Sequence, residues 1–137
     1  MAELVLPSHL VKWIDEQMPE LGGAGSVRWS MKPRLPFDWL PHDRSGFAAI
    51  TLWSTVHIRD RGQPFDLREP DWVDLVLHEL VHVEQFRRVG RVAFPARYLA
   101  LTAVHGYFHH PDEVEARERA QALVAPCLRF LSQRGGG

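Results

Sequence analysis

The segment from Pro70 to Gly90 has the sequence PDWVDLVLHELVHVEQFRRVG and decides how this chain folds. Pro70 favours an extended backbone in the residue before it, and Asp71 stands where a helix N-cap residue is expected. Gly90 suits a C-terminal cap, because glycine tolerates the positive φ found there. We therefore expect a helix from Trp72 to Val89.

Apolar side chains surround most of this expected helix, which predicts that it is buried on most sides. A polar side chain is costly to bury there without a partner, so the polar residues are informative. At about 100° per residue, four of them fall within roughly 80° of one another and form one stripe. The four are Asp74, His78, His82 and Gln85. Glu79 lies about 60° beyond His82, at the edge of the stripe.

The run His78-Glu79-Leu80-Val81-His82 indicates a metal site. Histidines four residues apart lie one helical turn apart, so both can direct an imidazole nitrogen at one ion about 2.0–2.1 Å away. Glu79 points beside that ion and can take a proton from its bound water. The alternative is a pair of hydrogen-bonded core histidines.

A catalytic zinc ion usually has three protein ligands and one open position. A metzincin would need a histidine six residues after His82, but Arg88 stands there, which excludes that subclass. The candidates downstream are His105, His109, His110, Glu113 and Glu115.

The sequence HELVHVEQ at residues 78–85, followed by HPDEVEA at 110–116, resembles the gluzincin branch of zinc metallopeptidases. It is more closely similar to a group of small, uncharacterised bacterial proteins assigned as metallopeptidases, which carry HELVHxxQ and then NPxExEA. The likeness covers roughly residues 47 to 120, and the two motifs are specific only together. The resemblance implies a minimal zincin-like fold and zinc-dependent hydrolysis of peptide bonds.

In gluzincins the third ligand is a glutamate on a second helix, commonly with Ala three residues later and Asp four residues later. The match on this chain is Glu113 with Ala116. Glu115 is the rival, since the two glutamates are about 200° apart on a helix and only one can face the metal. The resemblance thus implies zinc (Zn²⁺) held by His78, His82 and Glu113, with Glu79 as the general base.

Two positions depart from the pattern of the family. Arg117 replaces the Asp that normally orients a ligand histidine, a task that Asp74 or Asp112 could take over. His110 replaces the Asn before the proline. Gln85 lies on the ligand side of its helix and could also support a ligand, or be an ordinary surface amide.

A peptidase of this kind also needs a donor that stabilises the tetrahedral oxyanion. The candidates are Tyr98, His105, Tyr107 and His109. None has a diagnostic spacing, so a packing or surface role is the alternative for each.

The rest of the chain predicts helices and a small sheet. Helices are expected in the stretch Glu3–Met18 with Ser8 as N-cap, at 94–108, and after Pro111 to about Ser132 with a kink or break at Pro126. Strands are expected at 26–31 and 47–58; in the second, Ile50, Leu52, Val56 and Ile58 share one face, and its edge could receive an extended peptide. The order predicts an α+β fold: one zincin-like domain over 1–137, a small sheet packed on the central histidine-bearing helix, and a disordered tail at 132–137.

The composition of the chain argues against several classes of partner and location. The net charge of −1 gives no reason to expect nucleic acid or an anionic membrane as a partner, and no apolar run approaches the ~20 residues of a membrane span. Cys127 is the single cysteine, so no intrachain disulfide can form. Glu3 occurs early, without a basic start and an apolar core, so we expect no signal peptide and a cytoplasmic location.

The short chain leaves two hypotheses about function. The first is a zinc metallopeptidase acting on a peptide or protein. The second is a zinc-binding interaction module that keeps the site but is catalytically inactive or depends on a partner. With 137 residues there is little material for the second lobe of a substrate cleft. A homodimer or a partner chain could complete that cleft.

Overall fold

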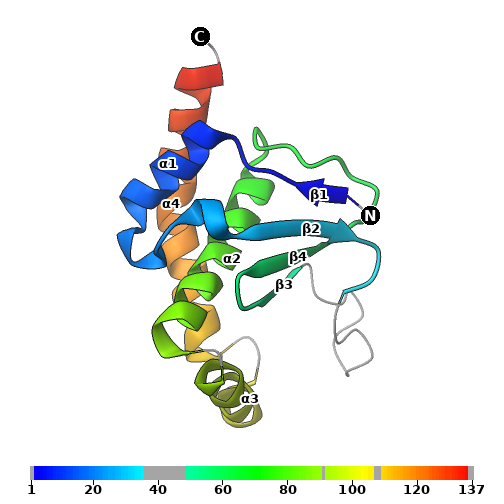
Figure 1. Cartoon of the computed structure of the whole chain (residues 1–137), viewed down its shortest axis with the longest axis vertical. Coiled ribbons are helices and arrows are strands. Elements are labelled where there is room, and N and C mark those ends of the chain that lie inside the picture. The colour runs from blue at the N-terminus through cyan, green and yellow to red at the C-terminus, as the bar shows by residue number, and fades with distance from the viewer. Residues whose placement is uncertain (1, 36–48, 91, 107–108, 136–137) are drawn as a thin grey trace. The chain divides into compact units, whose positions relative to one another are not determined.

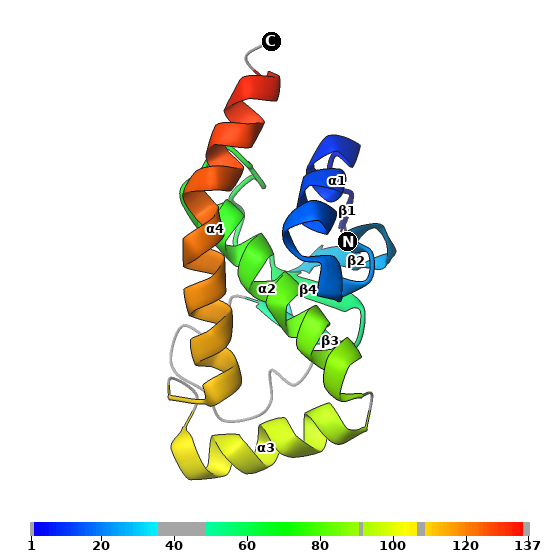
Figure 2. The same ribbon diagram turned by 90° about the vertical axis from the view of Figure 1, so that its left-hand side faces the viewer.

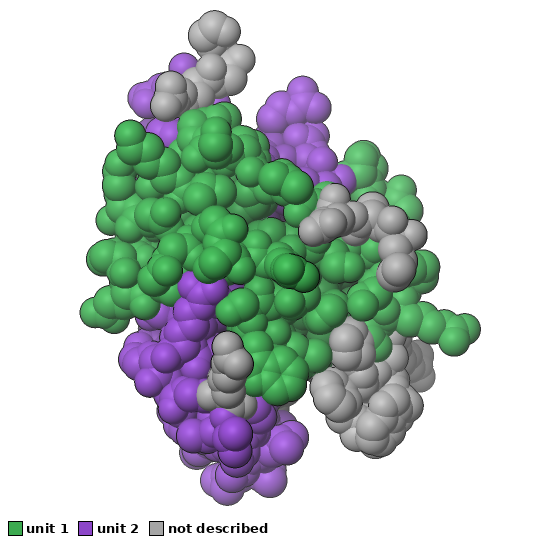
Figure 3. Space-filling model, viewed as in Figure 1, with its two compact units in different colours: residues 1–64 green, residues 65–137 purple. Residues whose placement is uncertain are grey.

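The computed structural model describes residues 2–35, 49–90, 92–106 and 109–135. The chain divides into two compact units, Met1–Pro64 and Phe65–Gly137 (Figure 3). Four helices and a small mixed sheet confirm the predicted α+β class (Figure 1). We also predicted one zincin-like domain and a sheet packed on the histidine-bearing helix. Both statements depend on how the two units are arranged, so they stay predictions.

The first unit holds the sheet and one helix. Its elements are β1 (Ala2–Leu4), α1 (Ser8–Gln17), the short 3-10 turns η1 (Pro19–Leu21) and η2 (Ala24–Ser26), β2 (Arg28–Lys32), β3 (Ala49–Leu52) and β4 (Thr55–Arg59). The strand order is β1-β2-β4-β3. Only the central pair β2–β4 is parallel, and the two outer pairs are antiparallel. The predicted strand at 26–31 corresponds to β2, shifted by two residues at its start.

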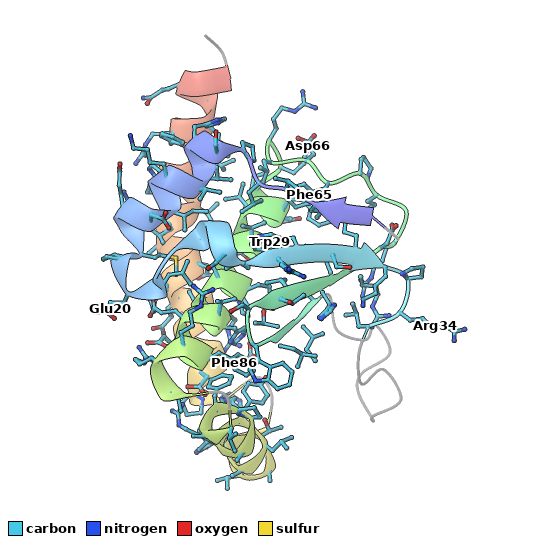
Figure 4. All side chains as sticks on the ribbon, in the orientation of Figure 1. Glu20, Trp29, Arg34, Phe65, Asp66 and Phe86 are labelled. Carbon is cyan, nitrogen blue, oxygen red and sulfur yellow. The ribbon has the colours of Figure 1, made fainter. Side chains whose placement is uncertain are left out.

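One face of the sheet is buried, as the alternation of side chains along a strand requires. Trp29 on β2 lies opposite Val56 on β4, and Met31 lies opposite Ile58. All four side chains are buried, and Figure 4 labels Trp29 on its strand.

The prediction of one continuous strand over 47–58 is wrong, because a two-residue turn at Trp53 and Ser54 folds the segment into the β3–β4 hairpin. Val56 pairs with the residue that follows Ile50, so Ile50 and Val56 lie on opposite faces instead of sharing one. Trp53 adopts a positive φ of 55°, a conformation that hairpin turns usually give to Gly, Asn or Asp. The turn therefore carries no sequence signal. Residues 47–48 lie outside the described part of the chain.

The second unit consists of α2 (Pro70–Val89), α3 (Ala93–His105) and α4 (Pro111–Gly135), shown in Figure 2. α2 and α4 pack along each other, and α3 connects them. Among the described residues, no helix combines the length and apolarity that crossing a membrane requires.

The ends of α2 follow the expected signals in part. Pro70 is the first helical residue, where its missing N–H costs nothing, and the N-cap is Glu69 without a side-chain bond. Asp71 lies in the first turn, so its predicted role as N-cap is wrong. Gly90 is the C-terminal cap, as predicted: its φ is 122° and its N–H donates to the carbonyl of Phe86 (2.8 Å).

The other helix limits differ from the predictions in detail. Ser8 is the first residue of α1 and Pro7 occupies the cap position. α3 ends at His105, before Gly106 with a φ of 74°. α4 continues through Pro126 without dividing and reaches Gly135, so residues 132–135 are helical rather than part of a disordered tail. Residues 136–137 lie outside the described part.

A buried ion pair joins α2 to α4. Glu84 is 1% exposed, and its carboxylate accepts two hydrogen bonds from the guanidinium of Arg119, at 2.6 and 2.9 Å. Arg88 adds a longer contact of 3.7 Å to the same carboxylate. On the same side of α4, Ala116 and Ala120 are fully buried one turn apart, and their small side chains permit close packing.

We predict that Arg119→Met lowers the free energy of unfolding by about 2 kcal/mol, because Glu84 would stay buried without its principal partner. Arg88 and the partial exposure of Arg119 keep the loss below that of a fully buried pair. Urea unfolding measures the change. The control is Arg129→Met at an exposed position of the same helix, which should change stability by less than about 0.5 kcal/mol. Equal effects of the two substitutions would contradict a stabilising role of the pair.

Candidate metal centre

Two histidines of α2 and one glutamate of α4 meet inside the second unit. His78 and His82 lie one turn apart, with ring centroids separated by 4.9 Å. Oε1 of Glu113 lies 3.0 Å from Nε2 of His78 and 3.1 Å from Nε2 of His82. His82 and Glu113 are buried, and the side chain of His78 is 16% exposed. The structure thus brings together the three residues predicted as metal ligands.

The separation of these donor atoms fits one divalent ion. Ligands about 2.0–2.1 Å from a tetrahedral zinc ion lie roughly 3.3 Å from one another. The two distances to Glu113 are shorter than that by only a few tenths of an ångström. Potential ligand atoms of His78, Glu79 and His82 also lie within 4.8 Å of one another. Small side-chain shifts would therefore suffice to admit the ion.

Glu79, the residue predicted as the general base, lies beside His78. It is 5% exposed, and its Oε2 lies 3.9 Å from Nε2 of His78. This separation is too long for a hydrogen bond and places the carboxylate beside the imidazole. Glu79 thus borders the cluster of His78, His82 and Glu113.

Glu115, the rival third ligand, lies away from the histidines. Its Oε1 accepts a hydrogen bond of 2.7 Å from the amide of Gln85 and contacts Arg88 at 3.5 Å. It follows Glu113 by two residues and so projects from another side of α4. The geometry favours Glu113 as the ligand.

The charges of His82 and Glu113 depend on each other. Burial alone would lower the pKa of His82, but the hydrogen bond and the charge of Glu113 overcome burial and raise this pKa to about 9. Burial likewise opposes charge on Glu113, but hydrogen bonds from His78 and His82 outweigh it and hold the pKa of that carboxyl well below its usual range. Without metal, the two groups form an imidazolium–carboxylate pair, so a metal ion must displace a proton.

Of the four predicted oxyanion donors, the structure brings Tyr98 to the site. Its hydroxyl on α3 donates to Oε2 of Glu113 at 2.5 Å, so one oxygen of that carboxylate faces α3 and the other faces the histidines. His105 and His109 lie on exposed positions. Tyr107 lies outside the described residues.

His110 caps α4 instead of binding metal, a role that the sequence interpretation missed. Its Nδ1 accepts the backbone N–H of Asp112 at 3.0 Å, so its Nε2 carries the proton and donates to the carbonyl of Tyr98 at 3.1 Å. The ring is fully buried and stacks on Tyr98 with centroids 4.1 Å apart. The sequence did contain a signal for this role. Proline is common as the first residue of a helix, so Pro111 marks the residue before it, His110, as the N-cap.

Within the described part of the chain, neither of the two acids considered as replacements for the missing Asp has a hydrogen bond to a predicted ligand histidine. Asp112 pairs with Arg97 at 3.0 Å. Asp74 lies one turn before His78, and its buried Oδ1 has no hydrogen-bond partner among the described residues. Burial raises the pKa of this carboxyl. Gln85 is the residue that contacts a ligand, since its Oε1 lies 2.8 Å from Nδ1 of His82.

We predict that the metal-free protein loses stability as the pH rises from about 6.5 to above 9. Folding raises the pKa of His82 from 6.5 to about 9, so its contribution is complete below 6.5 and is lost as the pH passes the folded value. Urea unfolding at a series of pH values measures this trend. Glu113→Gln should remove it, since a neutral amide attracts a proton on His82 far less. A flat wild-type profile over this range would contradict the ion pair.

No protein-family model, curated protein or solved structure matches this chain.

Proposed function

We propose that this protein is a zinc-dependent metallopeptidase of the zincin type. One observation carries the proposal: a carboxylate oxygen of Glu113 lies within about 3 Å of Nε2 of both His78 and His82, in a buried site. The acid at Glu79 borders the same donor set. Two imidazoles and one carboxylate, with a further acid beside them, are the composition of a catalytic rather than a structural zinc site.

The donor types favour zinc among the divalent ions. Imidazole nitrogen suits zinc and other late transition metals, whereas magnesium and calcium prefer oxygen ligands throughout. When bound, zinc would supply Lewis acidity that lowers the pKa of water and polarises a substrate carbonyl. His78, His82 and Glu113 would hold the ion and would leave it accessible to water or substrate.

The protein's own groups account for the proton transfers. In this proposal Glu79 takes one proton from the attacking water as the C–O bond forms. It then gives that proton to the nitrogen of the leaving amine as the C–N bond breaks, so that no net proton is consumed at this step. Burial strengthens these electrostatic interactions, because little water screens them. Tyr98 holds the second oxygen of Glu113, which keeps the first one directed at the histidines.

The second hypothesis, a catalytically inactive or partner-dependent zinc-binding module, is favoured by the surface of α3. This helix supplies Tyr98 to the site, yet Val92 at its N-cap and Leu99 and Val104 within it are exposed. Apolar side chains exposed on a helix that also contacts the site would suit the binding of a partner there. Turnover of peptides distinguishes the two hypotheses.

We predict that the purified protein binds one zinc ion and that Glu113→Ala weakens this binding far more than Glu115→Ala. Removal of Glu113 takes away a proposed direct ligand, whereas the hydrogen bonds of Glu115 go to Gln85 and Arg88. Metal analysis and competition with a chromophoric chelator measure the affinities. If Glu115→Ala is the more damaging change, the assignment of the third ligand is wrong.

We predict that Glu79→Gln abolishes peptide hydrolysis while zinc remains bound, because the amide cannot accept the proton from water. A peptide library assayed with and without chelator, together with metal analysis, tests this. The matched control is Glu118→Gln at an exposed position of α4, which should keep full activity. Persistent hydrolysis by the zinc-loaded Glu79→Gln protein would overturn the mechanism. A zinc-loaded wild type without turnover would favour the interaction module.

A further inference from the structure

Gln85 is a fully buried amide whose polar atoms all have partners in the second unit. Its Oε1 lies 2.8 Å from Nδ1 of His82. Its Nε2 donates to Oε1 of Glu115 at 2.7 Å and to the backbone carbonyl of Asp112 at 3.1 Å. The side chain therefore links α2 to the first turns of α4.

These contacts determine which way the amide points. The carbonyl of Asp112 and the carboxylate of Glu115 can only accept hydrogen bonds, so the NH₂ group of Gln85 must face them. The amide oxygen then faces His82, and an amide oxygen can only accept. Nδ1 of His82 consequently carries a hydrogen.

The position of that hydrogen determines what the other ring nitrogen can do. In a neutral imidazole with Nδ1–H, the lone pair lies on Nε2. Nε2 of His82 is the atom that lies 3.1 Å from Oε1 of Glu113, on the side of the proposed metal. With the opposite tautomer, the ring would direct an N–H at the metal and could not bind it.

We propose that Gln85 is the positioning residue of this metal centre: it holds His82 as the Nδ1–H tautomer with the Nε2 lone pair directed at the metal, and Glu115 in turn holds Gln85. The inference rests on the zinc site of the proposed function. In this inference Glu115 fixes the amide of Gln85 through its Oε1. Arg88 contacts the same oxygen at 3.5 Å and helps to hold the carboxylate in place.

The surroundings also explain why an amide occupies this position. A carboxylate at residue 85 could accept from His82, but it would face the carboxylate of Glu115 and the carbonyl of Asp112 with no hydrogen to offer. Only an amide combines one acceptor with two donors at the end of a side chain of this length. Arg117 stands where the family pattern has the Asp that orients a ligand histidine. In this proposal the neutral amide of Gln85 takes over that task, and it lies on α2, the helix that also carries His82.

The test compares Gln85→Met, Gln85→Glu, Glu115→Gln and the double variant Gln85→Glu/Glu115→Gln in the full chain. Zinc affinity is measured by competition with a chromophoric chelator, and the protonated ring nitrogen of His82 by ¹⁵N NMR. Gln85→Met should weaken zinc binding by about 10- to 100-fold, the usual effect of removing an outer partner of a ligand. Gln85→Glu should also weaken it.

The double variant should bind zinc more tightly than Gln85→Glu, although the carbonyl of Asp112 stays without its donor and keeps the recovery partial. The new carboxylate at position 85 accepts from Nδ1–H of His82, and the new amide at position 115 donates to that carboxylate. The ¹⁵N spectrum should show Nδ1–H on His82 in the wild type and the double variant. A merely structural role of Gln85 would not predict recovery by exchanging the two groups.

Wild-type zinc affinity and an unchanged His82 spectrum in Gln85→Met would overturn the inference, as would a folded double variant with no recovery. If Gln85→Met does not fold, the zinc affinities of Gln85→Glu and of the double variant are compared instead. A higher affinity of the double variant supports the inference, and equal affinities contradict it. A wild type that binds zinc without hydrolysing peptides contradicts the proposed activity but leaves these readouts intact. A wild type that takes up no zinc overturns the proposed function. The inference is then decided by ¹⁵N spectra recorded at a pH high enough for His82 to be neutral, where the hydrogen that remains on the ring should be on Nδ1 and a hydrogen on Nε2 would contradict the inference.

Discussion

The contact of the Glu113 carboxylate with His78 and His82 is the constraint on which the second unit depends. A buried carboxylate is strongly disfavoured unless opposite charge and hydrogen bonds surround it. Glu113 meets this condition through two imidazoles on α2 and the hydroxyl of Tyr98 on α3. The start of α4 is therefore tied to the polar stripe of α2, and α3 must bring Tyr98 to the same point.

The neighbouring polar groups follow from that constraint. Once Glu113 lies against the histidines, the beginning of α4 is buried, and its free backbone N–H groups need acceptors. The His110 ring supplies one of them and uses its other nitrogen on the carbonyl of Tyr98. Further along the interface, the buried pair of Glu84 and Arg119 fixes α2 against α4 at a second place. In the proposed metal centre, these contacts would hold the donor atoms in place before an ion binds.

Local sequence signals succeeded where structure depends on neighbours along the chain. Pro70, Gly90 and the apolar periodicity between them define α2 closely, because caps and helical faces are local properties. The same reasoning failed for β3 and β4, where Trp53 makes a tight turn that no typical turn residue announces. A two-residue turn reverses the chain and changes which residues share a face, so one missed turn misplaced Ile50 relative to Val56.

The sequence by itself determined that His78, Glu79 and His82 share a region of one largely buried helix, because a helix of about 3.6 residues per turn leaves no other arrangement. It also limited the candidates for a third ligand to five residues, His105, His109, His110, Glu113 and Glu115. Only the tertiary structure decided that Glu113, rather than Glu115, contacts the histidines and that Gln85 supports His82. The contacts of Glu113 with His78 and His82, and of Glu115 with Gln85, join residues 35, 31 and 30 positions apart along the chain. Packing of α2 against α4 sets such distances, and no periodicity within either helix encodes them.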